Sequence, residues 1–306
     1  MGLFDRLVIA GLPLVPRRVL WTVARRYVAG QSLDEALARI TALRAEGFDT
    51  ILDILGEGES SEAQARAAAA SYHELLAPLA PVDPHCTIAV KPTHLGLLHS
   101  EDLCAELLAE LCVAAAAAQR FVRFEMEDAP TIDGTLRVFE TVREQHSNLG
   151  CVLQSRLFRT GSDLERLLTR FPDLNVRLVK GIYLEPASIA HTDHAAITRA
   201  YLELADRLLE SDGHVGLATH DDEIVAHTQA TIRRLELDAP PQHERRHEYQ
   251  LLMGVRKPLA EQLRDAGHRV RIYVPFGADW HAYTLRRLKY NPEIARHVMR
   301  AVLRGD

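Results

Sequence analysis

Several charged and polar side chains stand at or near the ends of short apolar runs in this chain. A charged group beside an apolar run is costly to bury unless it has a partner or a function. As a set, such residues indicate a functional site rather than unrelated surface groups. Lys91 and Glu125 end two successive runs, and we expect them to form an ion pair. The residues of the set are Lys91, Glu125, Gln154, Lys180, Thr219, His220 and Tyr273.

A second candidate group lies near the carboxyl terminus, where Trp280–Asn291 has helical spacing after a Pro-Phe-Gly turn. Arg286 and Arg287 are adjacent in this segment, and Tyr283 precedes them by one helical turn. Two guanidinium groups can hold one carboxylate through bidentate hydrogen bonds, while tyrosine rings pack on the rest of the ligand. Taken alone, two arginines on a terminal helix more often form surface ion pairs, and a carboxylate-binding site is the functional alternative.

The elements that must position these residues alternate between short β-rich runs and segments of helical spacing. Parallel strands need crossover helices, and eight of them can close into a ring, so we predict an α/β fold with a (β/α)8 TIM-like barrel. The predicted strands are Thr50–Leu55, Thr87–Lys91, Phe121–Glu125, Gly150–Gln154, Val176–Lys180, His214–Thr219, Glu248–Leu252 and Arg269–Val274. The predicted helices between them are Ser61–Leu76, Glu101–Gln119, Leu136–Gln145, Asp163–Thr169, Asp193–Glu210, Asp222–Leu235 and Lys257–Ala266.

No linker rich in Gly, Ser or Pro divides the chain after the first predicted strand. We expect residues 1–48 to form extra N-terminal helices packed on the barrel, including Leu33–Ala45 with Ser32 as its cap. Residues 49–306 are predicted to form a single catalytic barrel, closed over its active site by the C-terminal helix. A doubly wound sheet is the alternative, but its GxGxxG signal is absent after the first strand.

Composition excludes several classes of protein. The 306 residues are 47% hydrophobic and 25% charged, as in an ordinary globular protein. Since 36 Lys and Arg face 42 Asp and Glu, the net charge of −6 argues against a nucleic-acid partner. The four cysteines show no CxxC spacing, which favours free thiols in a reducing cytoplasm.

The apolar stretch Leu7–Leu14 is too short to span a bilayer. The surrounding segment is locally basic, and peripheral docking at the inner face of a membrane is one interpretation of it. The interpretation that we favour is an amphipathic helix packed on the body of the protein.

Four ordered segments resemble the signature segments of the proline dehydrogenases, flavin-dependent barrel enzymes of proline catabolism. The likeness continues around Lys91 and Gln154, so it runs from the second predicted strand to the last helix. It implies an FAD across the mouth of the barrel, oxidation of L-proline to Δ1-pyrroline-5-carboxylate, and a quinone or similar electron acceptor. The four segments are Val176–Leu184 (VRLVKGIYL), Ala218–His220 (ATH), Tyr249–Gly254 (YQLLMG) and Tyr273–Asn291 (YVPFGADWHAYTLRRLKYN).

The resemblance also implies roles for individual residues. Arg177 corresponds to the arginine near the reactive flavin nitrogen, and Gln154 to the glutamine that touches the isoalloxazine ring. The implied cofactor-binding residues are Glu125, Met126, Gln154, Arg177, Val179, Lys180, Gly181, Tyr183, Thr219, His220 and Asp221. The implied substrate-binding residues are Lys91, Leu252, Tyr273, Tyr283, Tyr290, Arg286 and Arg287, of which Lys91, Tyr273, Tyr283, Arg286 and Arg287 are the implied catalytic set.

Four residues depart from the family pattern. Glu125 stands where the family has Asp, Ile182 where it has Ala, Tyr290 where it has an acidic residue, and Asp221 where it often has Asn. These changes leave two alternatives open, which are a related flavoenzyme acting on a proline analogue and a barrel that binds flavin or an amino acid without turnover.

Two other enzyme classes fit the residues less well. His191 and His194 have the types but not the convergent spacing of a metal centre, so we expect no metal. A Schiff-base aldolase would use Lys91 or Lys180, but neither has a distinctive sequence setting for that chemistry.

Overall fold

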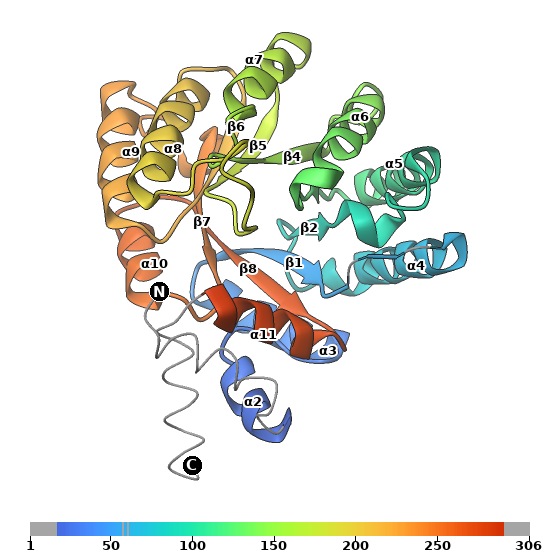
Figure 1. Ribbon diagram of the computed structural model, residues 1–306. Helices are drawn as coiled ribbons and strands as arrows, with labels where there is room; N and C mark the ends of the chain where they lie inside the picture. Colours follow the sequence, from blue (N-terminus) through green and yellow to red (C-terminus); the bar gives the residue numbers. More distant parts are fainter. Residues whose placement is uncertain (1–16, 57, 60, 291–306) are drawn as a thin grey trace, which may run out of the picture.

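Eight parallel strands close into a barrel in chain order, with β1 paired to both β2 and β8 (Figure 1). The computed structural model describes residues 17–56, 58–59 and 61–290. All eight predicted strands are confirmed, with ends that shift by no more than two residues. The strands are β1 (Asp49–Ile54), β2 (Thr87–Val90), β3 (Val122–Phe124), β4 (Leu149–Gln154), β5 (Asn175–Val179), β6 (His214–Ala218), β7 (His247–Leu252) and β8 (Val270–Phe276).

A ring of helices surrounds the barrel, as the helical spacing predicts. Helix α6 begins four residues earlier than predicted because a 3-10 turn at Ala129–Thr131 leads directly into it. Helix α4 continues three residues past its predicted end, with Pro78 in its last turn. The helices are α4 (Glu62–Leu79), α5 (Glu101–Ala117), α6 (Ile132–Arg143), α7 (Thr160–Arg170), α8 (His194–Leu209), α9 (Asp222–Arg234), α10 (Lys257–Asp265) and α11 (Trp280–Tyr290).

Two further helices, α2 (Arg17–Ala24) and α3 (Leu33–Ala45), precede the first strand. The predicted cap of α3 is confirmed, since the Ser32 side chain accepts a hydrogen bond from the Glu35 backbone and Glu35 returns the contact in a capping box. Helix α2 lies against α11, where the rings of Trp21 and Trp280 meet edge to face with centroids 4.7 Å apart. The division of the chain at residue 48 stays a prediction.

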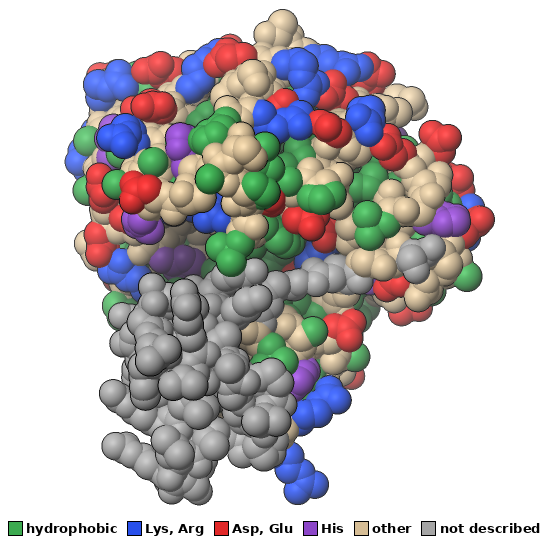
Figure 2. Space-filling model, viewed as in Figure 1, with side chains coloured by type: hydrophobic (Ala, Val, Ile, Leu, Met, Phe, Trp, Pro, Cys, Tyr) green, Lys and Arg blue, Asp and Glu red, His purple; other side chains and the backbone are tan. Residues whose placement is uncertain are grey.

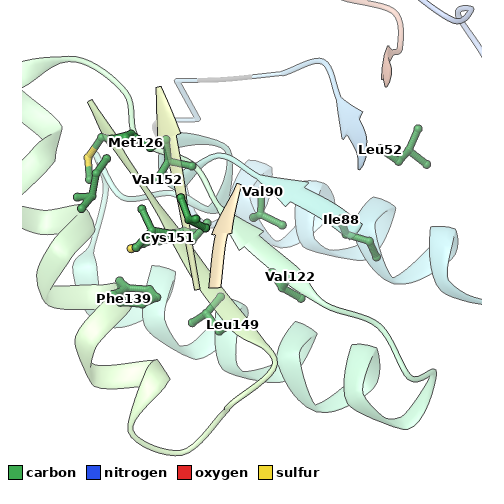
Figure 3. Close-up of a cluster of buried hydrophobic side chains, with 14 of the residues drawn as sticks. Leu52, Ile88, Val90, Val122, Met126, Phe139, Leu149, Cys151 and Val152 are labelled. Atoms are coloured by element: carbon green, nitrogen blue, oxygen red, sulfur yellow. The ribbon is translucent and has the colours of Figure 1, made fainter. Parts of the chain in front are cut away.

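The main apolar core lies between the strands and the helices. Leu52, Ile88, Val90 and Val122 come from neighbouring strands and share one buried cluster with Phe139 of α6 (Figure 3). Side chains alternate along a strand, so the residues between these positions face the barrel interior instead. That interior holds a small apolar layer with Ile51, Ala89 and Tyr273, and many charged and amide side chains. Those near the carboxyl ends of the strands line the candidate site.

The cysteines and the helices bear on two further predictions from the sequence. All four cysteines are buried and unbonded to one another, as predicted. In the described part of the chain, no helix combines the length and apolar character needed to cross a bilayer. The stretch Leu7–Leu14 lies outside the described residues.

Candidate active site

A cavity opens at the carboxyl ends of the barrel strands, where barrel enzymes place their active sites. Its open volume is about 1030 Å³, which includes the part that merges with solvent. On the face seen in Figure 2, hydrophobic side chains gather towards the middle and charged side chains lie around the upper edge. Twelve predicted site residues line the cavity, namely Lys91, Glu125, Met126, Gln154, Arg177, Val179, Gly181, Tyr183, His220, Leu252, Tyr273 and Tyr283.

Lys91 follows β2 and is bonded to a carboxylate from the first strand. Its Nζ donates to Asp53 Oδ1 at 2.9 Å, and both side chains are nearly excluded from solvent. The β1–β2 register pairs Asp53 with Ala89, two residues before Lys91, so both side chains project into the same end of the barrel. This contact corrects the predicted ion pair, because we expected Lys91 to pair with Glu125.

Glu125 pairs instead with Arg177 of β5, whose Nη1 lies 3.5 Å from Glu125 Oε2. Burial raises the pKa of Glu125, although Arg177 and Lys91 oppose that shift. Its Oε1 atom is buried without a hydrogen-bond partner among the described residues. The Arg177 guanidinium also lies over the Tyr273 ring, 4.9 Å from its centroid. An arginine, a carboxyl group and an aromatic ring therefore meet at the cavity wall.

Gln154 presents a second unsatisfied acceptor to the cavity. Its Nε2 donates to the Glu127 carbonyl oxygen at 2.7 Å, which leaves its buried Oε1 without a partner in the described part of the chain. Gly181 lies against this oxygen in a left-handed conformation, with φ of 93°. A Cβ at this position would stand 2.5 Å from Gln154 Oε1, so a glycine is required here. An acceptor with no partner and a gap kept free of side chains are features of a ligand site.

Three predicted cofactor residues lie beside the cavity rather than in its lining. Lys180 donates to Asp221 at 2.7 Å and to Thr198 at 2.8 Å. Asp221 caps helix α9 by accepting from the Glu223 backbone, and Thr219 accepts from the Asp221 backbone. Burial alone would raise the pKa of Asp221, but the hydrogen bond from Lys180 and its charge lower it overall. These contacts order the loop after β6 at the cavity edge.

The backbone of Arg286, Arg287 and Tyr290 lies in helix α11, as predicted. The side chains of these three residues lie outside what the structure describes. Their roles in a carboxylate clamp stay predictions.

Three charged or amide residues of the cavity lining were absent from the predicted site. Asp53, Glu127 and Gln250 line it alongside the predicted set. An aspartate in the middle of the apolar run TILDIL was the signal for Asp53. Gln250 sits inside YQLLMG, where a neutral amide gives little warning of a buried role.

The two histidines considered as metal ligands, His191 and His194, contact other side chains instead. The His191 ring meets Phe158 edge to face at 4.7 Å, and His194 begins helix α8 beside Lys180. Among the residues that the structure describes, no group of three or more His, Cys, Asp or Glu side chains could hold a metal ion.

The closed barrel and its polar cavity define an α/β-barrel enzyme with its active site at the carboxyl ends of the strands. A family model described as proline dehydrogenase matches residues 36–300. The chain is 34% identical to a proline dehydrogenase of Deinococcus radiodurans, covering 94% of this chain and 93% of the relative. It is 31% identical to proline dehydrogenase 1 of Bacillus subtilis, covering 92% and 91%. The chain belongs to the proline dehydrogenase family, and it is therefore an oxidoreductase.

The fold also matches a solved structure. Proline utilization A from Bdellovibrio bacteriovorus, in a crystal structure of the enzyme inactivated by N-propargylglycine, superposes with a TM-score of 0.80 at 25% identity. The match covers 89% of this chain and 33% of that longer one, so this chain spans about a third of that protein.

Proposed function

We propose that this chain oxidises L-proline to Δ1-pyrroline-5-carboxylate, with bound FAD as the first electron acceptor and a quinone or similar compound as the next. One observation carries the proposal. A single cavity in a member of the proline dehydrogenase family gathers twelve of the positions that the family resemblance assigns to cofactor and substrate.

The cavity residues fit a flavin ring. Gln154 Oε1 is a buried acceptor without a described partner, Gly181 keeps the space beside it clear, and a flavin ring carries an N–H donor. Bound FAD supplies a hydride acceptor, which no amino-acid side chain supplies. A cation such as Arg177 beside the ring stabilises the electron-rich reduced form. The residues proposed to hold FAD are Glu125, Met126, Gln154, Arg177, Val179, Lys180, Gly181, Tyr183, Thr219, His220 and Asp221.

The substrate side of the proposal begins with Lys91. Proline must present a neutral amine, because the nitrogen lone pair assists departure of the hydride from the neighbouring ring carbon. An ammonium group that Asp53 fixes at the cavity wall disfavours a second positive charge nearby and so favours the neutral amine. Tyr273 and Leu252 offer an aromatic and an aliphatic surface for the pyrrolidine ring.

The substrate carboxylate is assigned to the last helix. Arg286 and Arg287, with Tyr283 one turn before them and Tyr290 one turn after, are proposed to hold it by resemblance to the family. Holding both ends of proline places its reacting carbon against the flavin, and such orientation supplies most of the rate that the site needs.

A second candidate function follows from the residues that depart from the family pattern. Ile182 lines the cavity with 38% of its surface exposed, and Glu125 is one methylene longer than the aspartate of the family. Both changes alter the space and charge around a substrate. A related cyclic imino acid, or binding of flavin without turnover, is the alternative they favour.

Purified protein tests these candidates. Flavin absorbance that bleaches when proline is added supports the proposed reaction, and assays with a dye acceptor rank proline against hydroxyproline and N-alkylated relatives. Colourless protein that cannot be reconstituted with FAD refutes the proposal. Yellow protein that proline never bleaches favours the alternative.

The acceptor and the site of action are tested separately. We propose a cytoplasmic protein, with peripheral contact at the inner face of the membrane as the alternative that a quinone acceptor would favour. Sedimentation with anionic vesicles that contain a quinone analogue, followed by a turnover assay, tests that contact.

A further inference from the structure

Gln250 of β7 connects the cavity to a buried ion pair deeper in the barrel. Its Oε1 accepts from Arg177 Nε at 2.9 Å, and its Nε2 donates to Glu248 Oε1 at 2.7 Å. Glu248 in turn binds Arg271 through two hydrogen bonds of 2.6 and 3.0 Å. Gln250, Glu248 and Arg271 are all at least 96% buried. The cavity arginine is thereby attached to a chain of contacts closed off from solvent.

This chain of contacts fixes which way the Gln250 amide points. Burial alone would raise the pKa of Glu248, but the guanidinium groups of Arg271 and Arg269 hold it well below its usual range. An ionised carboxylate only accepts hydrogen bonds, so the NH2 group of Gln250 must face Glu248. The amide oxygen must then face Arg177. A glutamine without this neighbour could present either atom.

The backbone beside Gln250 is shaped for its amide. Gly216 of β6 lies next to it, and a Cβ at Gly216 would stand 2.4 Å from Gln250 Nε2. No real Cβ contact is that short, so any other residue at this position would displace the amide. The glycine at this position leaves room for the amide beside the strand.

Apart from the bond to Gln250, few contacts hold the Arg177 guanidinium in its orientation. Its Nη1 is 3.5 Å from Glu125, a long contact for an ion pair, and its face lies on Tyr273. Its Nη2 has no hydrogen-bond partner among the described residues. Without Gln250, the guanidinium would be free to turn towards Glu125 and form a closer pair. The bond to Gln250 keeps Arg177 in its place against the cavity.

We infer that Gln250 is a positioning residue, which orients the Arg177 guanidinium towards the flavin and keeps it from pairing closely with Glu125. The inference rests on the proposed function, because it concerns a flavin-loaded enzyme. It extends that proposal with a residue outside the family-derived set, carried by contacts of this chain alone.

The test compares flavin-loaded wild-type protein with a Gln250→Met variant, which keeps the length of the side chain and loses both hydrogen bonds. We expect a more negative flavin midpoint potential and a kcat for proline lower by about tenfold or more, with a smaller change in KM. The matched control is Thr228→Val, which removes a buried hydrogen bond to Tyr249 on the outer side of the barrel. The control should lose stability and keep the wild-type potential.

A second variant guards against misfolding of the first. Gly216→Ala removes no polar group but displaces the Gln250 amide, so it should shift the potential in the same direction. If wild-type protein oxidises proline while both variants keep its potential and kcat, the inference is overturned and the proposed function stands. If wild-type protein binds no flavin, both are overturned.

Discussion

The pair formed by Lys91 and Asp53 leads to a prediction about stability that needs no cofactor. The side chains are 11% and 2% exposed, and their charged atoms are 2.9 Å apart. Asp53→Asn keeps the shape of the side chain and removes its charge. Removing one partner of a buried ion pair lowers the free energy of unfolding by about 3–5 kcal/mol. We expect Asp53→Asn to lower the free energy of unfolding by about 3 kcal/mol, the lower end of that range. Lys91 borders an open cavity, and its charge also interacts with Glu125.

Urea unfolding followed by circular dichroism measures this loss. With a slope near 3 kcal/mol per molar urea, the midpoint should fall by about 1 M. Glu62→Gln is the matched control, since Glu62 pairs with Arg66 at 2.8 Å while both side chains are about half exposed. Such a surface pair contributes about 0.5 kcal/mol or less. Equal losses in the two variants would refute the reasoning that burial makes the Lys91 pair important.

The remaining predictions concern the cofactor, the substrate and pH. Gly181→Ala should lower the flavin content of purified protein, because φ is 93° and a Cβ would fill the space beside Gln154 Oε1. Gly161→Ala, in open space on helix α7, is the control and should leave the flavin content unchanged. Equal flavin content in the two variants would show that the space beside Gln154 is not needed for flavin. Arg286→Met or Arg287→Met should weaken proline binding by about 2–4 kcal/mol with FAD retained, and titration with unchanged affinity would exclude the clamp. Burial lowers the pKa of His247 to about 4, so the unfolded chain takes up a proton first as pH falls below 6.5. Stability should therefore fall between pH 6.5 and 4 by up to about 1.4 kcal/mol per pH unit from this group, and His247→Leu should flatten the measured slope.

The elements of the fold could be predicted from the sequence because their signals are local. Each strand is a short β-rich run and each helix a stretch of helical spacing, and Ser32 with Glu35 marks a helix start within four residues. Which residues belong to the site could be predicted from the order of the strands in the barrel. Once eight parallel strands close in chain order, their carboxyl ends must meet at one face.

The pairing of the charges could not be predicted in the same way. Lys91 and Glu125 end neighbouring strands, so a bond between them was a reasonable expectation, yet Lys91 reaches back to Asp53 on the other side. Gln250 and Arg177 are 73 residues apart, and nothing in either segment indicates the other.

The sequence by itself determined the barrel, its family and the strand ends that carry the chemistry, since these depend on periodicity along the chain and on ordered motifs. The tertiary structure alone decided which carboxylate meets which cation, and it brought Asp53 and Gln250 into the cavity. Register between strands and the inward turn of alternate side chains are set when the barrel closes, so each such contact depends on the whole ring of strands.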